Sequence, residues 1–201
     1  MAGSTKVYTP SAVHQGPYDL WVIVTAVPDD TAQRLTMDAA TGTPDGTTHA
    51  NSVHLGLTMG DVTIKVASKL ADIKGDQFAA ALDQFVTEEE ATLEFEMSEL
   101  EMQKLQRAMG VATYATAAGY KQMTFGGSNV PPKVCIAAIS PKRADSTKQY
   151  VALLYSAIAQ ANVSVALGRS KQSGYKVSFK ALADPARTAG RQVCNIYETI
   201  A

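Results

Sequence analysis

Carboxylates are the side chains of this chain whose grouping could carry chemistry. Three glutamates stand together at Glu88–Glu90, and Glu94 and Glu96 follow within the run ATLEFEM. Carboxylates act as general acids and bases, and clusters of them bind calcium. Calcium-binding loops take their ligands from alternate positions around a glycine at the bend, a spacing that residues 88–90 lack. We therefore predict that Glu88–Glu90 form a solvated loop before a strand, where their charge discourages edge-to-edge aggregation.

The histidines and cysteines do not form a recognisable site either. His14, His49 and His54 are scattered, which argues against a zinc site. Cys135 and Cys194 have no CxxC partner, which favours buried free thiols in a cytosolic protein; a long-range disulfide is the alternative. Nucleophile elbows, phosphate-binding loops and dinucleotide fingerprints are absent from the sequence. We expect no catalytic residue, no metal, no cofactor and no enzyme activity, with a hydrolase as the alternative.

Composition bounds the kind of partner. The 201 residues are 46% hydrophobic and 18% charged, which is enough apolar material for the core of one domain spanning 1–201. The formal net charge of −1 argues against a protein that binds nucleic acid by neutralising phosphates. The sequence has no basic and apolar leader at its start and no apolar run as long as a membrane span, so neither a signal peptide nor a membrane partner is expected.

Strand-like patterns dominate the chain and position the carboxylates. The run at 20–27 is β-branched and apolar, and a period of two runs through 52–59, 61–68 and 91–97, with a hairpin expected at residues 59–61. In the third of these periodic runs Glu94 and Glu96 oppose an apolar face, so they line a wet surface, either ordinary solvent-facing wall or the inside of a channel. Further strands are predicted at 133–140, 149–157, 161–168, 175–184 and 192–198.

One helix and several irregular segments complete the prediction. Ser98 and Glu101 form a capping box that starts a helix, and Gly110 suits its end. Residues 111–131 are rich in glycine and small residues, which indicates irregular structure. Residues 1–19 are predicted to be an N-terminal arm and residues 28–51 a long inter-strand loop. The fold class is therefore mainly β, with two packed antiparallel sheets in a sandwich or barrel and one flanking α-helix.

The order of these elements resembles the tail tube proteins of tailed bacteriophages. Residues 60–110 carry the resemblance, with a strand, the segment DIKGDQ around Asp76 and Gln77, the strand opening EATLEFEM, and a helix that closes on glycine. The final strands at 174–198, with the Asp-Pro turn at Asp184, are similar to the end of the same family. Tubes of contractile tails and of type VI secretion are similar in build.

The resemblance implies a homo-oligomer that forms hexameric rings, which stack into a hollow tail tube conducting phage DNA into the host. Its partners would be the tape measure, terminator and baseplate proteins, and a sheath if the tail contracts. The protein would be assembled in the bacterial cytoplasm and reside in the virion tail. Six copies giving four strands each would make a wall about 48 Å across, with an opening on the order of 35 Å. A DNA duplex roughly 20 Å wide would pass through it.

In such a tube Glu94 and Glu96 are candidates for the lumen wall, because carboxylates repel phosphates whereas Lys and Arg would hold them. Loop 28–51 is the candidate contact between rings, ordering when a neighbour buries Leu35 and Met37. Asp76 and Gln77 are further candidates for inter-subunit contact. The alternatives are a baseplate or terminator adaptor or a secretion-tube subunit of the same fold, and, in a different class, a monomeric β-sandwich binding module.

Overall fold

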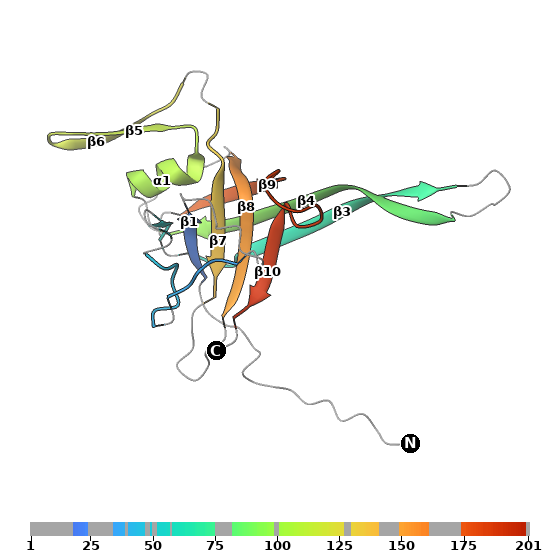
Figure 1. Cartoon of the computed structure of the whole chain (residues 1–201). Coiled ribbons are helices and arrows are strands. Elements are labelled where there is room, and N and C mark those ends of the chain that lie inside the picture. Colours follow the sequence, from blue (N-terminus) through green and yellow to red (C-terminus); the bar gives the residue numbers. More distant parts are fainter. Residues whose placement is uncertain are drawn as a thin grey trace.

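The computed structural model describes residues 18–23, 34–38, 40–46, 49, 52–56, 58–74, 82–98, 101–126, 130–140, 149–160 and 174–199. Within these ranges it contains ten strands and one helix (Figure 1). The elements are β1 (Asp19–Ile23), β2 (Val53–His54), β3 (Thr63–Ile73), β4 (Asp83–Met97), α1 (Met102–Met109), β5 (Thr113–Ala117), β6 (Tyr120–Thr124), β7 (Val134–Ile139), β8 (Tyr150–Gln160), β9 (Tyr175–Leu182) and β10 (Cys194–Glu198). The mainly-β prediction with two antiparallel sheets and one helix is confirmed.

The two sheets are unequal, and the larger one folds over on itself. Eight strands follow the order β2-β1-β7-β8-β9-β4-β3, with β10 added beside β8, whereas β5 and β6 form a sheet of their own. The sheet divides at one edge of β8: the first half of this strand pairs with β10 and the second half pairs with β9. The apolar faces of β1 and β7 thereby meet those of β4 and β9 around a core that includes Leu93, Phe95, Ile136 and Phe179.

The segment between β2 and β3 joins the two ends of the large sheet. The Leu55 amide donates to the carbonyl of Leu20 on β1 at 2.8 Å, and four residues later the Met59 amide donates to the carbonyl of Glu96 on β4 at 2.7 Å. The expected hairpin at 59–61 is wrong, because β2 pairs with β1 and β3 pairs with β4. Since both partners lie elsewhere in the chain, a local pattern could not reveal them.

A second apolar cluster lies on the outer face of β7 and β8. Its buried residues are Ile23, Leu35, Cys135, Ala137, Ile139, Val151, Leu153 and Tyr155. Part of the predicted loop 28–51 covers this face: Leu35 is 4% exposed, its amide donates to the Tyr197 hydroxyl at 3.0 Å, and Met37 packs alongside. Burial raises the pKa of Tyr197 to about 12 and that of the Cys135 thiol to about 12, so both stay protonated at neutral pH.

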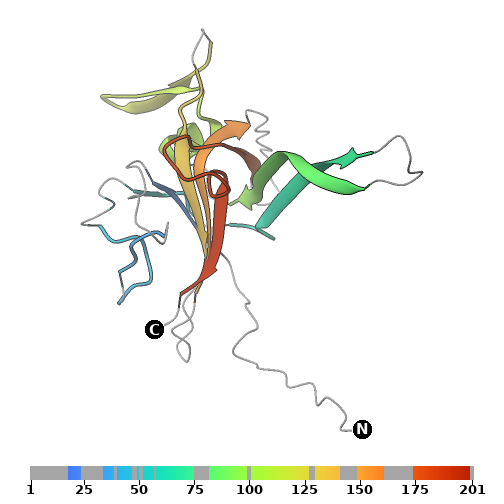
Figure 2. The same ribbon diagram turned by 45° about the vertical axis from the view of Figure 1, so that its right-hand side comes forward.

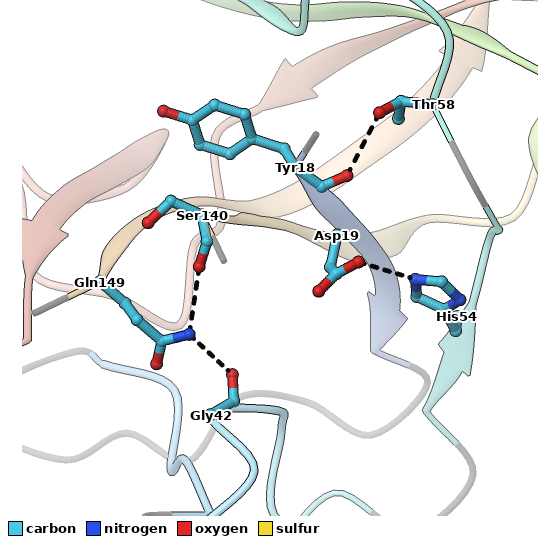
Figure 3. Close-up of polar contacts among 7 residues, drawn as sticks. All are labelled: Tyr18, Asp19, Gly42, His54, Thr58, Ser140 and Gln149. Atoms are coloured by element: carbon cyan, nitrogen blue, oxygen red, sulfur yellow. Dashed lines mark hydrogen bonds and ion pairs between the residues drawn. The ribbon is translucent and has the colours of Figure 1, made fainter. Parts of the chain in front are cut away.

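A buried glutamine fastens the same loop to the sheet. The Gln149 side-chain amide donates to the carbonyls of Gly42 and Ser140, both at 3.1 Å (Figure 3). Gly42 has a φ of +68°, and a Cβ there would come within 2.7 Å of the Gln149 amide, so glycine is required. Nearby, the Thr58 hydroxyl donates to the Tyr18 carbonyl at 3.4 Å, where the chain crosses from one end of the sheet to the other (Figure 3).

Three local predictions need correction. Residues 88–90, expected as a loop, belong to β4, because residues 67–69 of β3 pair with them. Residues 111–131, expected to be irregular, contain the β5–β6 hairpin with Gly119 at φ +91° in its turn. The capping box is also wrong: α1 begins at Met102 with Glu101 as N-cap and no side-chain cap bond, since β4 pairing continues to Met97. The predicted end at Gly110 is confirmed by its left-handed φ of 69°.

Several other predictions are settled in part. Cys135 and Cys194 are free thiols, the first buried and the second half-buried, so the alternative of a disulfide between them does not hold. The Asp184–Pro185 turn is present, with the Ala186 amide donating to Asp184 at 3.1 Å. Most of the N-terminal arm, part of the strand expected at 20–27 and all of the strand expected at 161–168 lie outside the described residues.

Truncating Leu35 tests whether loop 34–46 is part of the folded subunit. Leu35→Ala should lower the free energy of unfolding by about 2–5 kcal/mol, because it empties a buried site that the sheet cannot refill. Urea unfolding of the unassembled protein measures this. Leu70→Ala, at a leucine that is 56% exposed, is the matched control and should change stability by no more than about 0.5 kcal/mol. Equal effects would show that the loop adds nothing to the fold.

His49 makes the same loop sensitive to acid. The side chain is 1% exposed, its Nε2 accepts the Thr36 amide at 3.2 Å, and burial lowers its pKa from 6.5. The unfolded chain therefore binds the proton more readily, and the stability is present above pH 6.5 and lost as the pH falls toward the folded-state pKa. His49→Gln should remove this slope, which is at most about 1.4 kcal/mol per pH unit for one proton. Urea unfolding of both proteins between pH 5 and 8 gives the difference; parallel profiles would refute it.

Candidate assembly surface

The polar face of β3, β4 and β9 carries the predicted carboxylates. Glu94 on β4 accepts from the Lys65 ammonium on β3 at 2.8 Å, and Glu90 pairs with Lys180 on β9 at 2.9 Å. Farther along the β3–β4 ribbon, Lys69 donates a hydrogen bond to Glu88. This bond lowers the pKa of the Glu88 carboxyl and raises the pKa of the Lys69 ammonium. Strand register explains these contacts: Lys69 lies directly opposite Glu88, whereas Lys65–Glu94 and Lys180–Glu90 are diagonal pairs across Thr92, and all of these side chains share one face.

Glu96 lies directly opposite Lys176, so it too has a cation as its cross-strand neighbour. On this face the three strands present four glutamates and four lysines: Glu88, Glu90, Glu94, Glu96, Lys65, Lys69, Lys176 and Lys180. Glu94 and Glu96 thus lie on a face that also carries lysines, and their place on a lumen wall stays a prediction. A face with balanced charge neither attracts nor strongly repels a polyanion, and its exposed ion pairs contribute little to stability.

A groove of about 450 Å³ crosses this face beside the turn at residues 59–61. Asp61, Glu94 and Glu96 line it together with Lys176 and Gln160. Within the described ranges, no group of three His, Cys, Asp or Glu side chains could hold a metal ion. The groove presents charge and hydrogen-bonding capacity, and its lining comes from residues 59–61, from β3, β4 and β9, and from the end of β8.

The other predicted contact residues lie elsewhere. Leu35 and Met37 are on the opposite side of the fold, where the subunit's own sheet covers them. The expectation that a neighbour must bury Leu35 is wrong, since this leucine is 4% exposed in the single chain. A role of loop 28–51 in contacts between rings stays a prediction. Asp76 and Gln77 lie outside the described residues.

Sequence reasoning missed an exposed apolar surface of the fold. The β3–β4 ribbon leaves the body and projects to one side (Figures 1 and 2). We call residues 66–74 and 82–89 the arm. Its apolar side chains are about half exposed, between 45% and 56%. They are Val66, Leu70, Ile73, Leu82, Phe85 and Val86. The sequence of residues 66–73 and 82–86 is typical of strands, so the two strands themselves could have been predicted. No local pattern shows that their apolar side chains lack a packing partner within the chain.

A β-bulge sets which side chains share each face of the arm. Lys69 lies opposite Glu88 while Leu70 lies opposite Val86, which leaves Thr87 as the extra residue. Leu70 and Val86 therefore share the face that continues from the core, and Phe85, opposite Ala71, lies on the other face. The arm therefore exposes apolar side chains on both of its faces.

Comparison with known proteins adds little. No protein-family model matches the chain, and no curated protein sequence matches it. Among solved structures the chain is similar to one described as "Crystal structure of Hcp protein", with 12% sequence identity and a TM-score of 0.30 over 82% of this chain and 88% of that chain. A likeness this distant carries no argument. The helical part of the described chain has no segment with the length and apolar character of a membrane crossing.

Proposed function

We propose that the protein is the structural subunit of a hollow tube, built from hexameric rings that stack to form the tail tube of a bacteriophage. The observation that carries the proposal is the β3–β4 arm, which exposes apolar side chains on both faces. A two-stranded ribbon is marginally stable alone and needs a covering surface. The resemblance of residues 60–110 to tail tube proteins supplies the kind of assembly that would cover it.

The polar face of the large sheet suits the inner wall of such a tube. Strands β8, β9, β4 and β3 form four consecutive strands of that sheet, the number that a ring of six would need for a wall about 48 Å across. Three of its four lysines form ion pairs with glutamates and Lys176 lies opposite Glu96, so few free cations would hold the phosphates of passing DNA. This role belongs to the whole face, including Glu94 and Glu96, rather than to either carboxylate alone.

The proposal places the protein in the virion tail after assembly in the bacterial cytoplasm. Its lasting partners would be identical copies, the tape measure, terminator and baseplate proteins, and a sheath in a contractile tail. Its contact with DNA would be transient, and its work would be structural rather than enzymatic. The same fold could instead serve as an adaptor at a tail end or as a secretion-tube subunit.

Electron microscopy of the concentrated, purified protein tests the assembly. We expect rings with a central opening, stacked into tubes as the concentration rises, because each copy completes the surfaces of the next. Rings that never stack would favour an end adaptor over a tube subunit. A dispersed species with the 21.3 kDa mass of one chain under all conditions would rule the proposal out.

Reversing two charges tests whether the polar face lines the opening. Glu94→Lys combined with Glu96→Lys turns the balanced face into a cationic one, so rings of this variant should bind a short DNA duplex that wild-type rings do not hold. Binding should weaken steeply between 50 and 200 mM salt, as expected when phosphates are neutralised. Fluorescence anisotropy of the duplex measures the binding, and Glu94→Gln with Glu96→Gln is the matched control. Equal binding by all three proteins would remove this face from the lumen.

A further inference from the structure

Ten of the eleven exposed large apolar side chains of the described chain fall into two groups. Six belong to the arm, and four belong to a second surface formed by α1, the β5–β6 hairpin and the segment that leads to β7. We call this second surface, residues 101–126 and 130–133, the flank. Its members are Met102, Tyr120, Phe125 and Val130, exposed by 38%, 57%, 57% and 87%. The eleventh such residue, Ile196, lies on β10.

The two surfaces differ in charge. The arm has two lysines, Lys69 and Lys74, against four carboxylates, which gives a formal charge of −2. The acidic residues are Asp72, Asp83, Glu88 and Glu89. The flank has four cations against Glu101 alone, which gives +3. The cations are Lys104, Arg107, Lys121 and Lys133. The arm thus combines exposed apolar side chains with net negative charge, and the flank combines them with net positive charge, the pattern of complementary interface patches.

The two surfaces also point in different directions. The arm projects from one side of the body and the β5–β6 hairpin from the other, in both views (Figures 1 and 2). They therefore do not cover each other within one chain. Two different patches that complement each other on copies of the same chain give a head-to-tail contact, which closes into a ring when the rotation between copies allows it.

We propose that the arm of one copy docks on the flank of the next copy around the ring. This inference rests on the proposed function, because it names the contact by which the ring forms. Leu70, Val86 or Phe85 from the arm would pack against the exposed Tyr120 and Phe125, with Asp72 and Asp83 near Lys121 and Lys133. The partner is a second copy of this chain, since the chain itself supplies both the apolar area and the opposite charge.

Complementation between two defective variants tests the contact. The arm variant carries Leu70→Lys and Phe85→Lys, and the flank variant carries Tyr120→Lys and Phe125→Lys; all four side chains are more than half exposed, so both proteins should keep their fold. Each variant alone should remain monomeric. Mixed in equal amounts, the intact arm of one should dock on the intact flank of the other and stop at a dimer, twice the 21.3 kDa of one chain. Sedimentation velocity distinguishes the two masses.

Controls separate this inference from the proposed function. The variant with Leu70→Met and Phe85→Leu keeps the arm apolar and should assemble like the wild type, while circular dichroism checks that every variant is folded. If the wild type forms rings and the arm variant does too, the docking contact is wrong and the tube proposal stands. If the wild type never assembles, the tube proposal itself fails. Two variants that stay monomeric when mixed, although folded, would also overturn head-to-tail docking.

Discussion

A two-stranded ribbon has no interior, so the β3–β4 arm cannot bury its own apolar side chains. Within the body, β4 has β3 on one edge and β9 on the other, and its apolar residues meet the core. On the N-terminal side of Thr92, β4 pairs only with β3, so Leu70 and Val86 continue the core face without a core. Apolar area exposed in this way costs free energy that another surface recovers when it covers the arm.

The polar face of the same strands follows an opposite logic. Its glutamates and lysines satisfy each other across strands, as in Lys65–Glu94 and Lys180–Glu90, at distances of 2.8 and 2.9 Å. Exposed ion pairs of this kind add little to stability. Their main effect is to leave few unpaired charges on the face. A surface of unpaired lysines would hold polyanions, and one of unpaired glutamates would repel its neighbours in a ring. Charge balance permits close assembly around an opening.

The sequence predicted the alternation of buried and exposed residues within a strand well, but it did not predict which strands pair with each other. The alternation of Leu93, Phe95 and Met97 against Glu94 and Glu96 placed the two faces of β4 correctly, because period two depends only on local geometry. It could not show that β4 begins as early as Asp83, since that extension depends on pairing with β3.

The same limit explains two further differences. Capping rules pointed to Ser98, but the helix starts after β4 has finished pairing at Met97. The sequence predicted that a neighbouring subunit buries Leu35. In the structure Leu35 packs instead on the outer face of β7 and β8 of its own chain. In each case a contact distant in sequence prevailed over a local signal.

In the proposed tube, the two faces of the arm would connect ring closure to stacking. Leu70 and Val86 lie on one face, and Ile73 and Phe85 lie on the other. A single docked flank covers only one face of a ribbon, because the two faces point in opposite directions. In a ring, the second face must therefore be covered by something other than that flank, and a further copy in an adjacent ring offers the same chemistry. The exposed side chains that make one copy incomplete would then also make one ring incomplete, which is the property that a growing tube requires.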